Sequence, residues 1–232
     1  MKDLVVITGG NSGLGFELAK KYAKEGYAIY IIGLDENKLY FANKYLRDNF
    51  DVDVYSFCGN IANEEFVKKV FANINKEKYN IKCVINAAGK GAFCDIEDVT
   101  FDIINKNIEA NLIGLMLTCT EAIKYMNKNG GTIINVMSTA SLKGNSTEAA
   151  YCAAKWGAKG YTKSLQDYTK GTNIDVVAVY PGEMQTSFWN NECGKYPNTS
   201  TFMKPEAVAN KIFNILTDSD GLKVSKIVIE RK

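Results

Sequence analysis

Tyr151 and Lys155 stand four residues apart in the stretch Y-C-A-A-K, and together they could move a proton. On a helix, positions i and i+4 share one face, so the lysine ammonium can lie beside the phenol. A phenol has an ordinary pKa of about 10, and a neighbouring positive charge lowers that value. Because the chain contains no histidine, we predict that Tyr151 is the acid/base group and that Lys155 lowers its pKa.

The composition excludes several other kinds of site. Without histidine, the Ser-His-Asp and Cys-His nucleophile systems are excluded. The six cysteines form no C-x-x-C pair, and we expect no metal site. The net charge of +2 indicates neither nucleic-acid nor membrane binding. No signal peptide and no run of about 18 apolar residues is visible, so we expect a cytoplasmic protein.

Short apolar runs rich in Val and Ile alternate with longer stretches of helical periodicity. The expected strands are 4–8, 28–32, 53–57, 82–86, 132–137, 175–180 and 226–229, and the expected helices are about 16–24, 36–49, 63–75, 101–127, 151–170 and 204–217. This alternation indicates one α/β domain over residues 1–232, a doubly wound parallel β-sheet of about seven strands with helices on both faces. The irregular, aromatic-rich stretch 187–204 interrupts the alternation and is expected to be a lid over the binding site.

A glycine-rich turn, T-G-G-N-S-G-L-G, follows the first expected strand and opens the first helix. Glycine is needed where a backbone turns sharply or approaches a ligand closely. The free N–H groups and the positive dipole end of a helix N-terminus attract phosphate. This context predicts a dinucleotide site that includes the turn residues Gly9, Asn11, Ser12, Gly13, Leu14 and Gly15.

Six marks in chain order resemble the short-chain dehydrogenase/reductase family, in its smaller, classical type. They are the G-x-x-x-G-x-G spacing of Gly9, Gly13 and Gly15; N-A-A-G at Asn86, Ala87, Ala88 and Gly89; Asn111; Ser138; Y-x-x-x-K at Tyr151 and Lys155; and P-G-x-x-x-T at Pro181, Gly182 and Thr186. The resemblance covers almost the whole chain. It implies a Rossmann-type fold and an NAD(P)(H)-dependent oxidoreductase that interconverts a carbonyl and a secondary alcohol.

The resemblance also implies a role for each catalytic residue. Ser138 would polarise the substrate carbonyl, and Tyr151 would give or remove the proton on the carbonyl oxygen. Lys155 would lower the pKa of Tyr151 and hold the ribose hydroxyls next to the nicotinamide. Asn111 would support a chain of waters that carries protons to solvent. Elementary chemistry agrees, because hydride transfer places negative charge on the carbonyl oxygen and a hydroxyl aimed there stabilises it.

The remaining family marks concern the cofactor. The segment with Pro181, Gly182, Met184 and Thr186 would hold the nicotinamide carboxamide, and Asn60 with Ile61, which replace the usual Asp-Val, would lie at the adenine. At the end of the second strand, members that use NAD carry an acidic residue, and members that use NADP carry a basic residue just after it. This chain has Gly33 and Leu34 there, so neither marker is present. The room left by Gly33 slightly favours NADP(H) over NAD(H), with Leu34 beside the ribose.

The sequence leaves the small-molecule substrate open among a ketone, a 3-oxoacyl thioester, a keto sugar and a hydroxy acid. The aromatic residues of 187–204, together with Phe93, Leu142 and Met184, indicate a partly apolar pocket. The helices 101–127 and 151–170 have broad apolar faces similar to the dimer bundle of the family, and they predict a homodimer, with a homotetramer as the alternative. Two other functions remain open: a non-catalytic nicotinamide-binding sensor or scaffold, and a sugar-nucleotide epimerase or dehydratase.

Overall fold

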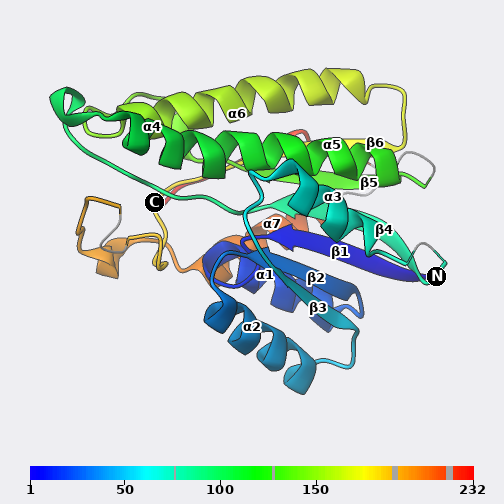
Figure 1. Cartoon of the computed structure of the whole chain (residues 1–232). Coiled ribbons are helices and arrows are strands. Elements are labelled where there is room, and N and C mark those ends of the chain that lie inside the picture. Colours follow the sequence, from blue (N-terminus) through cyan, green and yellow to red (C-terminus); the bar gives the residue numbers. More distant parts are fainter. Residues whose placement is uncertain (76, 127–128, 190–192, 218–221) are drawn as a thin grey trace.

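The described part of the protein is organised around a sheet of seven parallel strands in the order β3-β2-β1-β4-β5-β6-β7 (Figure 1). The computed structural model describes residues 1–75, 77–126, 129–189, 193–217 and 222–232. The strands are β1 (Lys2–Thr8), β2 (Ala28–Gly33), β3 (Val54–Cys58), β4 (Tyr79–Asn86), β5 (Gly131–Val136), β6 (Ile174–Pro181) and β7 (Lys226–Ile229). The strand order reverses between β1 and β4, which is where such sheets bind ligands.

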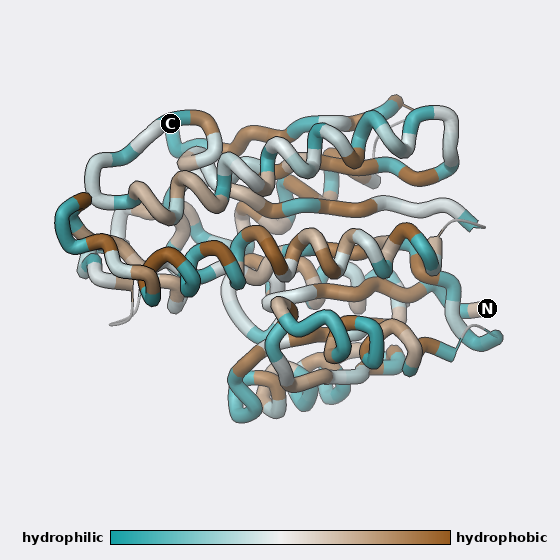
Figure 2. Tube along the Cα trace, turned by 45° about the horizontal axis from the view of Figure 1, so that its top comes forward, coloured by the Kyte–Doolittle hydropathy of each residue, from teal (hydrophilic) through white to brown (hydrophobic). Residues whose placement is uncertain are grey.

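Helices cover both faces of the sheet. They are α1 (Gly13–Lys24), α2 (Glu36–Asn49), α3 (Glu64–Ala72), α4 (Phe101–Ile108), α5 (Gly114–Met126), α6 (Ala149–Tyr168) and α7 (Pro205–Thr217). Helices α3, α5 and α6 pack on the face that buries Leu4 and Val6 of β1, whereas α1, α2 and α7 pack on the face that buries Val5 and Ile7. Figure 2 shows hydrophobic residues along the strands between the two helix layers. Each buried aliphatic side chain contributes about 1.5–3 kcal/mol to the burial that stabilises this arrangement.

The fold class predicted from the sequence is confirmed, and all seven expected strands are present. One expected helix differs: the stretch 101–127 divides into α4, a π-helical turn (Glu109–Ile113) and α5, and residue 127 lies outside the described residues. A π turn holds an extra residue and often marks a functional position. Within this turn, Asn111 Nδ2 donates to Lys90 O at 2.6 Å and to Asn107 O at 2.9 Å. These bonds tie the helix to the segment that follows β4.

Among the helices in the described ranges, none is long and apolar enough to span a membrane. In the same ranges, no group of three or more Cys, Asp or Glu side chains is arranged to hold a metal ion.

Candidate active site

A cavity of about 870 Å³ lies beyond the carboxyl ends of the central strands. The structure brings nearly all of the site residues predicted from the sequence to its lining: Gly9, Asn11, Ser12, Gly13, Leu14, Gly15, Leu34, Asn60, Ile61, Ala87, Ala88, Gly89, Ser138, Tyr151, Lys155, Pro181, Gly182, Met184 and Thr186. Asn86 and Asn111 are the exceptions, because both are buried behind this lining. One hollow therefore joins the glycine turn to the tyrosine and lysine of α6.

The glycine turn is shaped by close backbone approaches. Gly9 has a φ of +66°, and a Cβ on it would lie 2.8 Å from the backbone of Ala88. A Cβ on Gly15 would clash with the carbonyl oxygen of Gly9. Gly13 has a φ of +51°, and its Cβ would lie 3.1 Å from Cγ2 of Thr186. An L side chain would be strained by the positive φ at Gly9 and Gly13, and backbone atoms leave no room for a Cβ at Gly9 and Gly15, so glycine suits all three positions.

The N-terminus of α1 faces this cavity and is suited to an anion. The helix begins at Gly13, and the side chain of its N-cap residue, Ser12, makes no capping hydrogen bond. Ser12, Gly13 and Leu14 all line the cavity. The first N–H groups of a helix and its positive dipole end bind phosphate well. The residues present thus fit the pyrophosphate of a dinucleotide.

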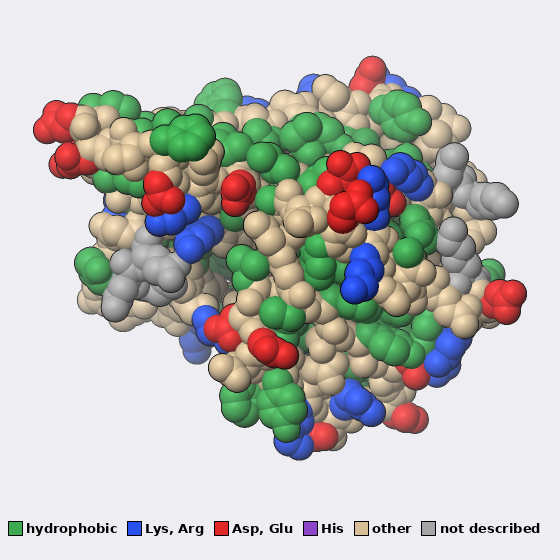
Figure 3. Space-filling view, in the orientation of Figure 1, with side chains coloured by type: hydrophobic (Ala, Val, Ile, Leu, Met, Phe, Trp, Pro, Cys, Tyr) green, Lys and Arg blue, Asp and Glu red, His purple; other side chains and the backbone are tan. Residues whose placement is uncertain are grey.

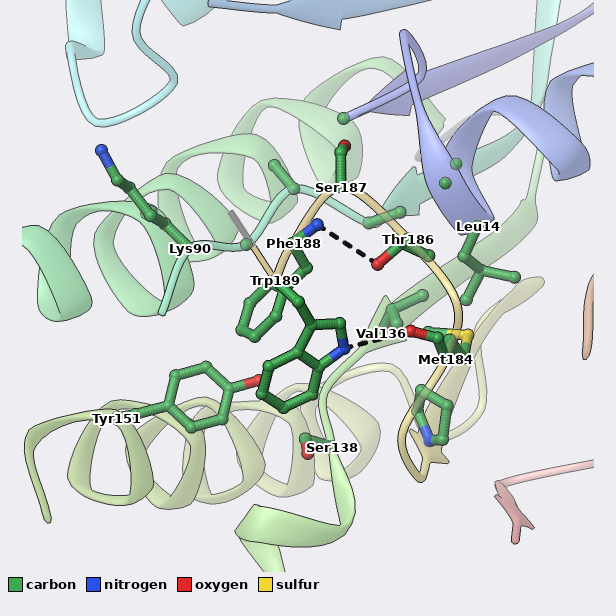
Figure 4. A pocket seen from close by; sticks show the side chains of 18 of the residues that line it. Leu14, Lys90, Val136, Ser138, Tyr151, Met184, Thr186, Ser187, Phe188 and Trp189 are labelled. Atoms are coloured by element: carbon green, nitrogen blue, oxygen red, sulfur yellow. Dashed lines mark hydrogen bonds between the residues drawn. The ribbon is translucent and has the colours of Figure 1, made fainter. Parts of the chain in front are cut away.

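Tyr151 and Lys155 lie in the first two turns of α6, and both are buried, with exposed fractions of 7% and 3%. The Nζ of Lys155 lies 5.7 Å from the centroid of the Tyr151 ring and 3.5 Å from the carbonyl oxygen of Val136. Ser138 lies two residues after the end of β5, and its hydroxyl is close enough to Tyr151 to act on the pKa of the phenol. Its Oγ also accepts a hydrogen bond from the Ala140 N–H at 3.1 Å, which fixes its direction. Two hydroxyls are thereby presented together at the cavity wall (Figure 4).

The protonation of this pair is governed by burial. Burial raises the pKa of Tyr151 well above its usual value, while the hydrogen bond from Ser138 lowers it and the charge of Glu148 raises it further. Burial also lowers the pKa of Lys155 to about 8. These directions differ from the expectation that Lys155 lowers the pKa of Tyr151. The physical reason is desolvation, which disfavours the charged form of each group.

Asn86 and Asn111 lie just behind the cavity lining. Asn86, predicted to belong to the cofactor site, donates from Nδ2 to Asn135 Oδ1 at 2.9 Å within a buried network behind the cavity lining. Asn111 Oδ1 is buried and has no hydrogen-bond partner. A Cβ on Gly89 would lie 3.0 Å from this oxygen and 3.5 Å from Nζ of Lys155. The amide oxygen and the ammonium therefore converge on one point beside Gly89.

The end of β2 shows how the Gly33 position is filled. The side-chain amide of Asn11 lies against Gly33, at 2.7–2.8 Å from where a Cβ would be. The prediction that Gly33 leaves open room therefore needs correction, because an amide occupies that room. Asp35 accepts a hydrogen bond from the Lys38 N–H at 3.0 Å as the N-cap of α2. Leu34 is 68% exposed and lines the cavity nearby.

Asn60, which the sequence predicts to lie at the adenine, forms a local hydrogen bond between its side chain and the backbone. Its Oδ1 accepts a hydrogen bond from the Ala62 N–H at 2.9 Å. Asn60 and Ile61 nevertheless line the cavity. The second lone pair of the Asn60 amide oxygen is the acceptor that an adenine amino group could still use.

The segment after Met184 packs against Tyr151. Phe188 and Tyr151 have ring centroids 5.8 Å apart, and Phe188 and Trp189 have centroids 5.2 Å apart. Trp189 Nε1 donates to Met184 O at 3.1 Å, and the Phe188 N–H donates to Thr186 Oγ1 at 3.3 Å (Figure 4). Of the expected lid 187–204, residues 190–192 lie outside the described residues, and the rest includes a short 3-10 turn at Thr199–Thr201.

The sequence interpretation missed an ion pair in the cavity lining. Glu148, the N-cap residue of α6, and Lys195 lie 2.6 Å apart. They are separated by 47 positions and belong to no motif, so no local signal could have revealed the pair.

Comparison with known proteins decides the family. Residues 3–196 match the model of the short chain dehydrogenase family. The chain belongs to this family. It is 31% identical over 186 residues to carbonyl reductase family member 4 of Danio rerio, covering 80% of this chain and 77% of the relative. It is also 31% identical over 222 residues to a 3-oxoacyl-(acyl-carrier-protein) reductase of Rickettsia felis, covering 92% and 88% of the two chains.

Solved structures agree with this assignment. A short-chain dehydrogenase/reductase from Vibrio parahaemolyticus superimposes with a TM-score of 0.85 at 33% identity, covering 98% of this chain and 96% of that one. As a short-chain dehydrogenase, the protein is an oxidoreductase.

Proposed function

We propose that this short-chain dehydrogenase uses NAD(P)(H) to interconvert a carbonyl group and a secondary alcohol, with residues 1–232 acting as one catalytic domain. The observation that carries the proposal is that Ser138, Tyr151 and Lys155 share one cavity with the glycine turn at Gly9–Gly15. Cofactor and substrate can therefore meet at the tyrosine. A bound nicotinamide would supply the hydride in reduction or accept it in oxidation.

The chain's own residues would handle the oxygen and its proton. In reduction, the hydroxyls of Ser138 and Tyr151 donate hydrogen bonds to the carbonyl oxygen and stabilise the charge that develops on it. Tyr151 then gives its proton to that oxygen, and the alcohol forms. Lys155 stabilises the resulting phenolate and would also hold the ribose hydroxyls. The unpartnered Oδ1 of Asn111 is placed to accept a hydrogen bond from a water near Lys155, through which the tyrosine regains its proton.

The cofactor would lie across the cavity, with its pyrophosphate at the start of α1 and its nicotinamide by the 181–186 segment. Its residues would be Gly9, Asn11, Ser12, Gly13, Leu14, Gly15, Leu34, Asn60, Ile61, Ala87, Ala88, Gly89, Pro181, Gly182, Met184 and Thr186. We favour NADP(H) slightly over NAD(H). No acid stands at Gly33 to repel a 2′-phosphate, and the amide of Asn11 beside it is a neutral donor.

The substrate would carry an apolar group next to its carbonyl. The tyrosine ring is packed against Phe93 at 5.3 Å and Phe188 at 5.8 Å, and Trp189 lies 6.1 Å from Phe93. A substrate that enters here must replace some of these ring contacts, each worth about 0.5–1.5 kcal/mol beyond burial. An apolar substituent offsets that loss, whereas a strongly hydrated one does not.

A second copy of the chain would be the protein partner, as a homodimer. Large hydrophobic side chains are exposed along α4, the π turn, α5 and α6: Phe101, Ile104, Ile113, Met116, Trp156 and Tyr168. Figure 3 shows hydrophobic side chains across the upper part of the molecule, over these helices. On the same face, acidic and basic side chains are interspersed, which gives no field of one sign for nucleic acid. All six cysteines are free thiols, which suits a reducing compartment such as the cytoplasm.

The test is the substitution Tyr151→Phe, with Tyr161→Phe on the same helix as the matched control. NADH and NADPH binding is measured first, and turnover is then measured on a panel of ketones with the tighter cofactor. We expect Tyr151→Phe to lower kcat by about 10²–10⁴-fold while the cofactor Kd changes little. Near-normal turnover in that variant would refute the mechanism. Cofactor binding without turnover in the wild-type chain would instead favour a sensor.

A further inference from the structure

Three segments that are distant in sequence meet around the catalytic tyrosine. The Phe93 N–H donates to Cys193 O at 2.8 Å, and the Cys94 N–H donates to Thr147 O at 3.1 Å. Gly194 has a φ of +77°, and a Cβ on it would clash with the carbonyl oxygen of Phe93. The residues after β4, those before α6 and those at 193–195 are therefore packed as one wall beside Tyr151.

An ion pair connects two of these segments, residues 193–195 and the N-terminus of α6. Lys195 Nζ lies 2.6 Å from Glu148 Oε1, and the two side chains are 31% and 13% exposed. The other carboxylate oxygen of Glu148 accepts a hydrogen bond from Asn145 Nδ2 at 2.8 Å. The same Nζ lies 5.0 Å from the ring centroid of Phe93, and that ring packs edge-on against Tyr151 at 5.3 Å. Since Glu148 is little exposed and fully engaged, it depends on Lys195 for charge compensation.

We propose that Lys195 and Glu148 form a positioning clamp for the acid/base reaction: the pair holds residues 193–195 and Phe93 against the N-terminus of α6, and it cancels the charge of a carboxylate one helical turn from Tyr151. This inference rests on the proposed function, because Tyr151 must be the acid/base group. The clamp acts through the wall and through the field at the phenol, and not by contact with the reacting atoms.

The ionisation of Tyr151 responds to the other titratable groups near it. The charged residues that line the cavity are Asp35, Lys38, Lys90, Lys143, Glu148, Lys155, Glu183, Lys195, Glu230 and Arg231. Two cysteines, Cys152 and Cys193, pack in the same hydrophobic cluster as Tyr151. Glu148, the N-cap residue of α6, stands three residues before Tyr151, and its charge acts against ionisation of the phenol. Loss of Lys195 would leave that charge uncompensated, and loss of Glu148 would leave the positive charge of Lys195 uncompensated. The two losses must therefore shift the ionisation of the phenol in opposite directions.

The experiment compares Lys195→Met, Glu148→Gln, the double variant and Lys195→Arg in the full-length protein. The readout is kcat/KM for alcohol oxidation as a function of pH, because oxidation requires the phenolate. The value of kcat/KM should rise as the pH increases. We expect the midpoint of this rise to shift to higher pH by about 0.5–1 unit in Lys195→Met and to lower pH in Glu148→Gln. The double variant and Lys195→Arg should return close to wild type. Lys170→Met, which breaks an exposed ion pair at the far end of α6, is the control.

A second readout does not depend on turnover. Hydrogen exchange of the Phe93 N–H, which bonds to Cys193 O, should become at least about tenfold faster in Lys195→Met and in the double variant, and should remain slow in Lys195→Arg. Shifts of the pH profile in the same direction in both single variants, or no shift with unchanged exchange, would overturn the clamp. If the wild-type chain shows no turnover, the proposed function fails, and the exchange measurement still decides whether the pair holds the wall.

Discussion

Burial of Lys155 should destabilise the protein at neutral pH. Its side chain is almost fully buried, and its pKa is lowered from 10.5 to about 8. Because the folded-state pKa lies below the unfolded-state pKa, the unfolded chain binds more protons between about pH 8 and 10.5. The free energy of unfolding therefore rises with pH in that window. Below about pH 8 both states are protonated, and the full cost is present.

The magnitude follows from the shift. A displacement of about 2.5 pH units corresponds to about 3 kcal/mol at pH 7, and about 1 kcal/mol of that cost remains at pH 9.5. The substitution Lys155→Met keeps the length of the side chain and removes the charge. We expect it to abolish turnover and to raise the free energy of unfolding by up to about 3 kcal/mol at pH 7. The gain should shrink by about 2 kcal/mol at pH 9.5.

The assay is urea unfolding of the wild-type chain, Lys155→Met and Lys170→Met between pH 7 and 9.5. Lys170 is the matched control because its side chain is 76% exposed just after the C-terminal end of the same helix. The difference in unfolding free energy between the wild type and each variant is compared across pH, because the contributions of the other lysines and tyrosines cancel in that difference. A difference that stays constant across this pH range would show that Lys155 keeps an ordinary pKa, and it would refute the reasoning.

Two further substitutions test the nucleotide end of the cavity. Gly9→Ala places a side chain at positive φ and 2.8 Å from the backbone of Ala88, so it should lower the unfolding free energy by about 2–4 kcal/mol and weaken cofactor binding. Gly26→Ala, at a φ of +86° with open space around it, should cost only about 1–2 kcal/mol and leave binding intact. Gly33→Asp should displace the Asn11 amide and change the ratio of NADPH to NADH affinity by about tenfold or more toward NADH, as measured by fluorescence titration. An unchanged ratio would show that the Gly33 position does not face the ribose.

The strands and the glycine turn were predictable because their signals are local. A run such as residues 4–7 is apolar throughout, and that pattern by itself indicates a strand buried on both faces. The order Gly9, Gly13, Gly15 between a strand and a helix likewise depends only on neighbours in sequence. Even the spacing of Tyr151 and Lys155 correctly placed both on one helix.

Other features depend on contacts between distant segments. The π turn at Glu109–Ile113 interrupts a stretch of continuous helical periodicity, and Asn111 within it bonds to Lys90, 21 residues earlier. The amide of Asn11 fills the position over Gly33 because two strand ends meet there. The Lys195–Glu148 pair spans 47 residues and is formed by two irregular segments. No periodicity or motif encodes such meetings, so the sequence alone could not reveal them.

The pKa of Tyr151 also depends on the folded environment, which the local spacing of residues does not reveal. The spacing of Tyr151 and Lys155 suggested a charge that stabilises the phenolate, whereas burial favours the neutral form of both groups. A protonated phenol is the form that donates to a carbonyl oxygen, so the buried pair is already set for reduction. In the proposed oxidation the phenolate is the required form, and it needs positive charge close by. Lys155 would supply that charge, as would the ring of a bound oxidised nicotinamide, and in the proposed clamp Lys195 would neutralise the opposing charge of Glu148. The ionisation of Tyr151 is therefore governed by the burial of the whole site together with the nearby charge of Lys155, and the spacing of the two residues alone does not determine it.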